Sequence, residues 1–189
     1  MGEPLSEEEI RAATVGERRP HNATIHLTPY DPAWPGIYER LARVIREALG
    51  DGVSLLEHVG STSVPGLTAK PIIDILLSVA DSSDETAYVP QLEAQGFTLR
   101  IREPNWYEHR MLMTPNVEGH LHVFTAGCEE IERMLRFRDW LRAHPEDRQL
   151  YEDAKKELAA RTWRYVQNYA DAKSAVVEEI MARASGGSA

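Results

Sequence analysis

Residues 53–79 constrain the fold more than any other part of the sequence. They read VSLLEHVGSTSVPGLTAKPIIDILLSV, in which two apolar runs flank a loop rich in Gly, Ser, Thr and Pro. The second run, Pro71 to Val79, is almost continuously apolar, which is typical of a strand buried on both faces of a sheet. Helices must therefore cover both faces. Asp74 is the one carboxylate in that run, and burying it is unfavourable unless it is paired or binds a cation.

The other periodicities predict strands mixed with helices, followed by helices alone. Strands are expected at 23–27, at 53–59, at 71–79, and in the segments FTLRIRE, WYEHRMLMT and GHLHVFT. Helices are expected from Asp31-Pro32 to Gly50, within part of 81–96, from Glu129, from Pro145, and around Val176 to Met181. The predicted class is an α+β domain with a helical C-terminal half.

Composition favours one domain of ordinary size. The 189 residues are 42% hydrophobic, and we expect a domain over 23–184 between a flexible arm (1–22) and a flexible tail (185–189). The net charge of −9 argues against a broad nucleic-acid surface, so any anion must bind in a local pocket. One cysteine excludes an intramolecular disulfide and a thiolate zinc cluster. No segment is typical of a secretory signal or a membrane span, so we expect a soluble, cytoplasmic protein without a membrane partner.

The loop after residue 59 carries groups that suit an anion. Gly60 is followed by three hydroxyls, Ser61, Thr62 and Ser63, and the segment ends at Lys70. Hydroxyls and backbone N–H groups at such a turn can converge on phosphate. An ordinary tight turn uses the same residue types, and the lysine does not fit the Walker pattern.

Several blocks of the chain resemble the GrpB family. They are EHVGSTSVPGLTAKPIIDI, GHLHV, FRDWLRAHPE with the following AKKELA, and YADAKSAVVEEI. The resemblance runs from about residue 25 to 184. It implies the nucleotidyltransferase-like superfamily, with a small mixed sheet flanked by helices, and it leaves the family's reaction undefined.

The superfamily's active-site pattern is Gly-Ser followed, about a dozen residues later, by a strand with two acids two residues apart. Gly60 and Ser61 match the first element, and Asp74 matches the first acid. The match implies a catalytic role for Ser61 and Asp74, and a metal-binding role for Asp74. Leu76 occupies the place of the second acid. Two-metal transfer uses paired carboxylates to hold its cations, Mg²⁺ or Mn²⁺. The departure at Leu76 favours an altered site.

Histidines are the residues that could complete such a site. His120 and His122 are two apart in GHLHV and are expected to share one face of a strand, where they could bind a metal or phosphate. Glu57 joins them as a metal ligand if its strand is adjacent, and His122 is a catalytic candidate. The alternative is a hydrogen-bonded polar face. His58 could orient a loop hydroxyl or lie in the core.

Three further side chains are candidates outside these motifs. Arg110 and Arg138 could clamp phosphate or carboxylate through their planar guanidinium groups. A buried salt bridge is the alternative for both, and we expect it for Arg138. Trp106, beside Pro104-Asn105, could stack a nucleobase.

Two functions remain open at this point. One is metal-dependent transfer from a nucleoside triphosphate to a small acceptor. The other is a binding or accessory module that keeps a pocket for a nucleotide or another small anion, and Leu76 favours it. Hydrolysis at a histidine and carboxylate metal site is a weaker third possibility.

Overall fold

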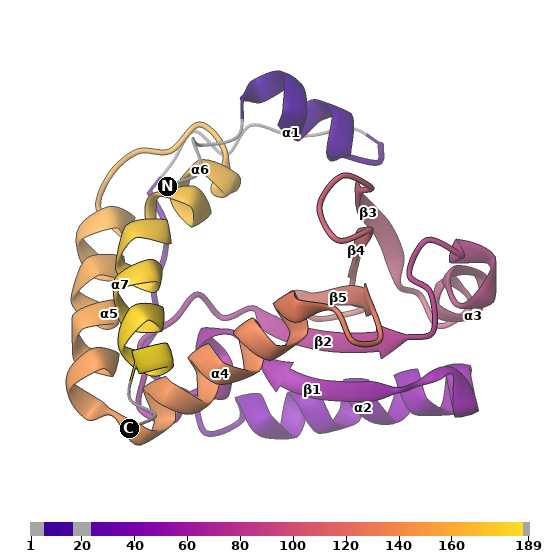
Figure 1. Ribbon diagram of the computed structural model, residues 1–189, viewed down its shortest axis with the longest axis horizontal. Helices are drawn as coiled ribbons and strands as arrows, with labels where there is room; N and C mark the ends of the chain where they lie inside the picture. Colours follow the sequence, from indigo (N-terminus) through magenta and orange to yellow (C-terminus); the bar gives the residue numbers. More distant parts are fainter. Residues whose placement is uncertain (1–5, 17–23, 187–189) are drawn as a thin grey trace.

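The computed structural model describes residues 6–16 and 24–186, and its centre is a five-stranded mixed sheet (Figure 1). In chain order the strands are β1 (Leu55–Val59), β2 (Ile73–Val79), β3 (Thr98–Glu103), β4 (His109–Met113) and β5 (Gly119–Thr125). Their order in the sheet is β1-β2-β5-β4-β3. β2 and β5 run parallel, and the other neighbouring pairs are antiparallel. The predicted α+β class is confirmed, and so is the placement of GHLHV beside PIIDILL.

One face of the sheet packs on α2 (Trp34–Leu49) and α3 (Val89–Glu93). Alternate residues of β2, among them Ile75 and Leu77, point to this face and join the largest apolar core. In α2 the apolar side chains recur at helical spacing, and Leu41 and Ile45 are buried against the strands.

The opposite face carries both the apolar contact with α4 and the polar residues of interest. In α4 (Glu129–Ala143) the side chain of Ile131 packs with Val59, Leu76 and Phe124. Asp74 is two residues from Leu76 on the same strand, so it points to this face as well.

The C-terminal helices form a second layer beside the sheet. They are α5 (Pro145–Ala159), α6 (Val166–Ala172) and α7 (Ser174–Gly186). In Figure 1, α4 crosses from the sheet to α5 and α7, which lie together at one end of the molecule. Leu141, Tyr151 and Ile180 of these helices pack on Val64 and Leu67. This contact fixes the loop between β1 and β2.

The helical half agrees with the prediction, with one addition. Helices begin at Glu129 and Pro145 as expected, and the separate short helix α6 was not foreseen. None of the helices in the described part of the chain has both the length and the hydropathy that crossing a membrane requires.

Two local predictions were wrong. Residues 24–27 form no strand, although Thr28 makes an isolated bridge with Ala69. The helix predicted from Asp31-Pro32 starts at Trp34, because the Asp31 carboxylate accepts a hydrogen bond from Ala33 N and makes a turn. Part of 81–96 is helical, as predicted: a 3-10 turn, η3 (Glu85–Ala87), precedes the short α3.

The structure describes only part of the predicted arm (1–22) and of the predicted tail (185–189). Residues 7–13 form α1 (Glu7–Ala13), which is capped by Ser6 and Glu9. Ile10 is buried, and Val15 N donates to Arg100 O of β3. Residues 185 and 186 belong to α7, while 1–5, 17–23 and 187–189 lie outside the described residues.

Candidate functional site

Asp74, His120 and His122 form one compact group on the α4 side of the sheet. Asp74 pairs with His120 in the parallel ladder between β2 and β5, and His122 follows two residues later. Asp74 Oδ1 lies 3.4 Å from His120 Nδ1 and 3.6 Å from His122 Nε2. One ligand atom from each of the three lies within 4.8 Å of the others. The prediction that both histidines face Asp74 is confirmed.

Gly60 makes room for Asp74. Its φ is +67°, a conformation that residues with a side chain rarely adopt. A Cβ atom at this position would lie 2.3 Å from Asp74 Oδ2, well inside van der Waals contact. The glycine therefore lets the loop backbone pass directly beside the carboxylate.

A hydrogen-bonded chain from Glu103 through the buried His109 supports His122. His122 Nδ1 lies 3.1 Å from His109 Nε2, and His109 Nδ1 lies 2.6 Å from Glu103 Oε2. The rings of His109 and His122 are stacked, with centroids 5.3 Å apart. His109 is 4% exposed, so β3 and β4 supply a dry support for a ligand on β5.

This chain determines which nitrogen of His122 faces Asp74. Burial lowers the pKa of His109 despite its bond to Glu103, so His109 is neutral and donates Nδ1–H to that carboxylate. Its Nε2 then accepts Nδ1–H from His122, which leaves His122 Nε2 directed at Asp74. Two facing electron-pair donors need a proton or a metal ion between them. Metal-binding histidines commonly have this kind of support.

Asp74 itself is held as an anion. Burial acts to raise its pKa, but hydrogen bonds and charge interaction with His120 and His122 outweigh burial and hold the pKa well below its usual range. The carboxylate is therefore available to a cation across the neutral pH range.

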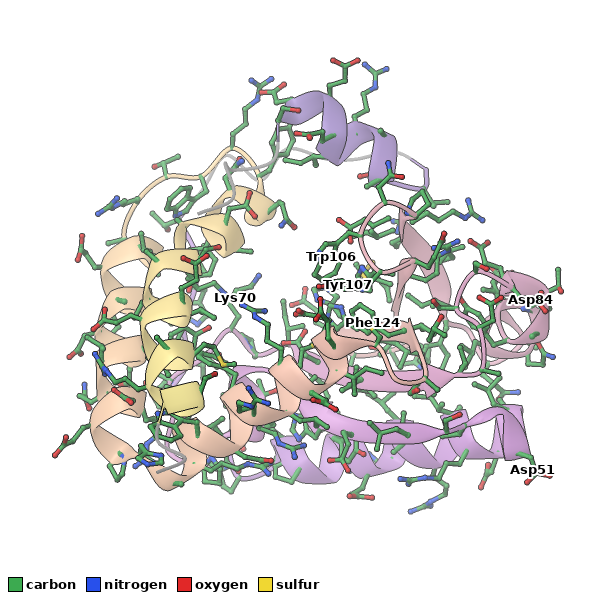
Figure 2. The ribbon with its side chains drawn as sticks, viewed as in Figure 1. Asp51, Lys70, Asp84, Trp106, Tyr107 and Phe124 are labelled. Carbon is green, nitrogen blue, oxygen red and sulfur yellow. The ribbon has the colours of Figure 1, made fainter. Side chains whose placement is uncertain are left out.

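The group opens into a cavity of about 330 Å³ between the sheet and the C-terminal helices. Three lysines line it, Lys70 from the loop, Lys155 from α5 and Lys173 after α6, whereas Asp74 is the one acidic residue among the described residues that line it. In the view of Figure 2, Lys70 points toward the middle of the molecule. A chain with net charge −9 thus carries a locally basic cavity, as an anion site requires.

Lys155 is the least accessible of these cations. It is 2% exposed, and its Nζ donates to Thr68 O and, over 3.2 Å, to Ser61 Oγ. Burial, reinforced by the charge of Lys173, lowers the pKa of Lys155 to about 7. The pKa of Lys70 is lowered for the same two reasons. An anion that entered the cavity would stabilise the charged form of both amines.

Of the loop hydroxyls, only Ser61 lines this cavity. Thr62 is buried and donates to Ile72 O over 3.0 Å, while its oxygen accepts from His58 Nε2 at the same distance. Ser63 donates to Gly60 O. The hydroxyls predicted to bind substrate at positions 62 and 63 therefore hold the shape of the turn, η2 (Ser61–Ser63).

His58 lies in the core, one of the two roles expected for it. Its ring stacks on Tyr38 with centroids 4.9 Å apart, and burial lowers its pKa to about 4. It is a neutral residue of the core that orients Thr62.

Two predicted site residues lie away from the cavity. Glu57 shares the sheet face of Asp74 but pairs with Arg138, Nη1 to Oε2, over 2.7 Å, and so stays outside the group of metal-ligating atoms. Arg110 lies on the other face, beside Val123 in the ladder, where it pairs with Glu85 over 2.6 Å. Both arginines therefore form salt bridges, as expected for Arg138.

Trp106 lies in the turn between β3 and β4. It is 43% exposed, and one edge of it contacts His109 and Phe124. Tyr107 and Glu108, which follow it, have φ near +50° although neither is glycine. Figure 2 shows Trp106 and Tyr107 facing the central region, although they do not line the 330 Å³ cavity.

Four residues at the site were not found from the sequence. Lys155 and Lys173 lie in helical segments where a lysine normally indicates a solvated surface. His109 and Glu103 are six residues apart across a turn, and only the pairing of β3 with β4 brings them together. The hairpin pattern, Pro104-Asn105 between two strands, is the one sequence signal for that pairing.

Comparison with known proteins identifies the family. The model of the family described as "GrpB protein" matches residues 24–183. This chain belongs to the GrpB family. A UPF0157 protein of Halalkalibacterium halodurans is 59% identical over 96% of this chain and 93% of its own length, and one of Streptomyces coelicolor is 43% identical over 89% and 95%.

A solved structure agrees with this assignment. The crystal structure of the conserved protein GrpB from Enterococcus faecalis superposes with a TM-score of 0.72 at 31% identity, covering 84% of this chain and 96% of that one. The fold described above is therefore the GrpB fold.

Proposed function

We propose that this GrpB protein binds a nucleoside triphosphate together with one divalent cation in the 330 Å³ cavity. The observation that carries the proposal is the meeting of a three-residue metal-ligand group with three lysines in a single cavity. Metal ions and lysines are the usual partners of a polyphosphate. A cavity of this volume suits a small molecule and not a polymer.

The donor set fits a metal ion, and it narrows the choice of ion. Tetrahedral ligands about 2.0 Å from a metal lie about 3.3 Å from one another, close to the 3.4 and 3.6 Å separations at Asp74. Two imidazoles and one carboxylate suit Zn²⁺ or Mn²⁺ better than Mg²⁺, which prefers oxygen ligands. Of the two expected ions we therefore favour Mn²⁺, and we add Zn²⁺ as a candidate.

The chain's own residues would bind and orient the phosphates. Lys70, Lys155 and Lys173 supply cationic donors in the same cavity, and Ser61 supplies a hydroxyl. Tyr169 also lines the cavity, and its buried hydroxyl has no partner among the described residues. Such an orphan group is satisfied when a ligand or water enters. A bound cation would neutralise and polarise phosphoryl oxygens.

Leu76 supports binding without ordinary two-metal transfer. It is fully buried against Val59, Phe124 and Ile131. The place of the second carboxylate is therefore filled by apolar packing, and no described residue supplies an acid there. We expect slow or absent turnover with ordinary nucleotidyl-transfer substrates.

A second candidate is transfer with one metal. Ser61 Oγ lies 3.2 Å from Lys155 Nζ, and a lysine whose pKa is about 7 can accept a proton near neutral pH. Metal-dependent release of pyrophosphate that disappears in Ser61→Ala and Asp74→Asn would support this candidate over the binding module.

A thermal-shift matrix tests the proposed binding. The four common triphosphates are added with and without Mn²⁺, Zn²⁺ or Mg²⁺ to wild type, Asp74→Asn and the control Asp51→Asn, an exposed aspartate outside the cavity. Ligand at 100 times its Kd stabilises by about 2.7 kcal/mol, or roughly 5–10 °C for a domain of this size.

We expect the metal-dependent part of the shift to disappear only in Asp74→Asn. Equal shifts with and without metal, or in all three proteins, would remove Asp74 from a metal role.

A further inference from the structure

A second cavity, of about 420 Å³, lies on the other side of the turn at Ser61–Ser63. It is bordered by the beginning of α2, by the Ser63–Pro65 segment and by the corner between α4 and α5. Figure 1 shows that corner beside the first turns of α2. None of the residues of the metal group lines it, so it is a separate place on the molecule.

Three arginines converge on this cavity, Arg138 and Arg142 from α4 and Arg148 from α5. Arg138 is used by Glu57, Asp139 and His58 O. Arg142 donates to Ser63 O through Nε and Nη2 and to Asp139 through Nη1. These two guanidinium groups are therefore largely occupied in holding the turn.

Arg148 is different. It is half-buried, and its guanidinium has no hydrogen-bond or ion-pair partner among the residues that the structure describes. All five of its N–H groups remain for a ligand. Neighbouring arginines repel one another at this cavity: burial and, after it, the charge of Arg138 lower the pKa of Arg142. A bound anion would reduce this repulsion. Two acidic side chains also line the cavity: Glu57, which is paired with Arg138, and Glu39, which is exposed.

Aromatic and proline side chains form another part of the wall. Tyr30 and Tyr38 line it with Pro35 and Pro65. Tyr38 is fixed by its hydroxyl, which donates to Leu56 O over 3.1 Å, and Tyr30 packs edge-on against Trp34. Fixed aromatic rings beside a free guanidinium suit a molecule that has a planar ring and an oxyanion.

We propose that this cavity binds a small oxyanion, phosphate or carboxylate, attached to a planar ring, with Arg148 as its main anchor. A ligand bound in this cavity would affect the first cavity, because Arg138 and Arg142 hold His58 O and Ser63 O on either side of Gly60 and Ser61. The site is independent of the metal proposal, since it shares none of those ligands.

Titration calorimetry with phenyl phosphate, benzoate and inorganic phosphate tests the inference. Phenyl phosphate and benzoate compare the two oxyanions, and phenyl phosphate and inorganic phosphate measure the contribution of the ring. The variants are Arg148→Gln, Glu39→Gln and the control Arg43→Gln, an exposed arginine of α2 outside this cavity. Loss of a bidentate ionic contact should weaken binding about tenfold or more in Arg148→Gln. Glu39→Gln should strengthen it, and Arg43→Gln should leave it unchanged.

Asp74→Asn separates this inference from the proposed function. We expect it to bind the ring-bearing probe as wild type does, even if nucleotide binding is lost. The proposal is overturned if neither ring-bearing probe binds wild type at about 10 mM, if Arg148→Gln and Arg43→Gln bind alike, or if Asp74→Asn abolishes binding.

Discussion

Replacing Lys155 with methionine should remove a large pH dependence from the stability of the fold. Its pKa falls from 10.5 to about 7 on folding because the amine is buried. Between these values the unfolded chain holds a proton that the folded chain has released, so stability rises as pH increases. The slope is about 1.4 kcal/mol per pH unit, and the full penalty below pH 7 is about 5 kcal/mol.

The substitution also leaves Thr68 O and Ser61 Oγ without their donor. An unmade buried hydrogen bond costs about 1–3 kcal/mol, which offsets part of the gain. At pH 7 we therefore expect Lys155→Met to be more stable than wild type by a small margin, and less stable than wild type at pH 10.

Urea unfolding followed by tryptophan fluorescence at pH 7, 8, 9 and 10 measures this difference directly. Subtracting the variant from wild type removes the contribution of other titrating groups, such as Lys70. Lys156→Met is the matched control, because the amine of Lys156, the next residue in α5, is 52% exposed and paired with Glu152. Parallel pH profiles for wild type and Lys155→Met would refute the assignment of a buried, partly neutral amine.

Two further predictions concern the metal group. Gly60→Ala should displace the Asp74 carboxylate, because its Cβ would lie 2.3 Å from Oδ2 at a φ of +67°. We expect a loss of about 1–2 kcal/mol in urea unfolding together with loss of the metal-dependent thermal shift, and retention of that shift would contradict the close approach. His109→Phe keeps a stacked ring but removes the acceptor for His122 Nδ1–H. Mn²⁺ affinity by calorimetry should fall roughly 10- to 100-fold. His144→Phe, a control between α4 and α5 that does not line the cavity, should bind as wild type does.

The sequence predicts the metal group because its information is local and periodic. Two histidines at a period of two must share a face, and a lone carboxylate in a doubly buried strand needs a partner. Gly60 lies close to Asp74 because it directly follows Val59, which pairs with Asp74 in the ladder between β1 and β2. These features depend on one strand, its neighbour and the loop before it.

What the sequence could not predict depends on contacts between distant elements. Lys155 is 94 residues from Ser61. The period of α5 places it on the face of Tyr151 and Ala159, but it does not show which side chains of other elements meet that face. Arg110 was misplaced for a related reason. Its face is set by the register with β5, and the turn signals fix neither where β4 begins nor that register.

Counting bound Mn²⁺ by electron paramagnetic resonance tests the central claim most directly. Free Mn²⁺ gives a signal that is lost on binding, so a titration of wild type, Asp74→Asn and Asp51→Asn yields the number of sites and their affinity. We predict one saturable site per chain in wild type and in Asp51→Asn, and its loss in Asp74→Asn. No saturable binding in wild type, two ions per chain, or equal binding in Asp74→Asn would contradict a single cation held by Asp74, His120 and His122.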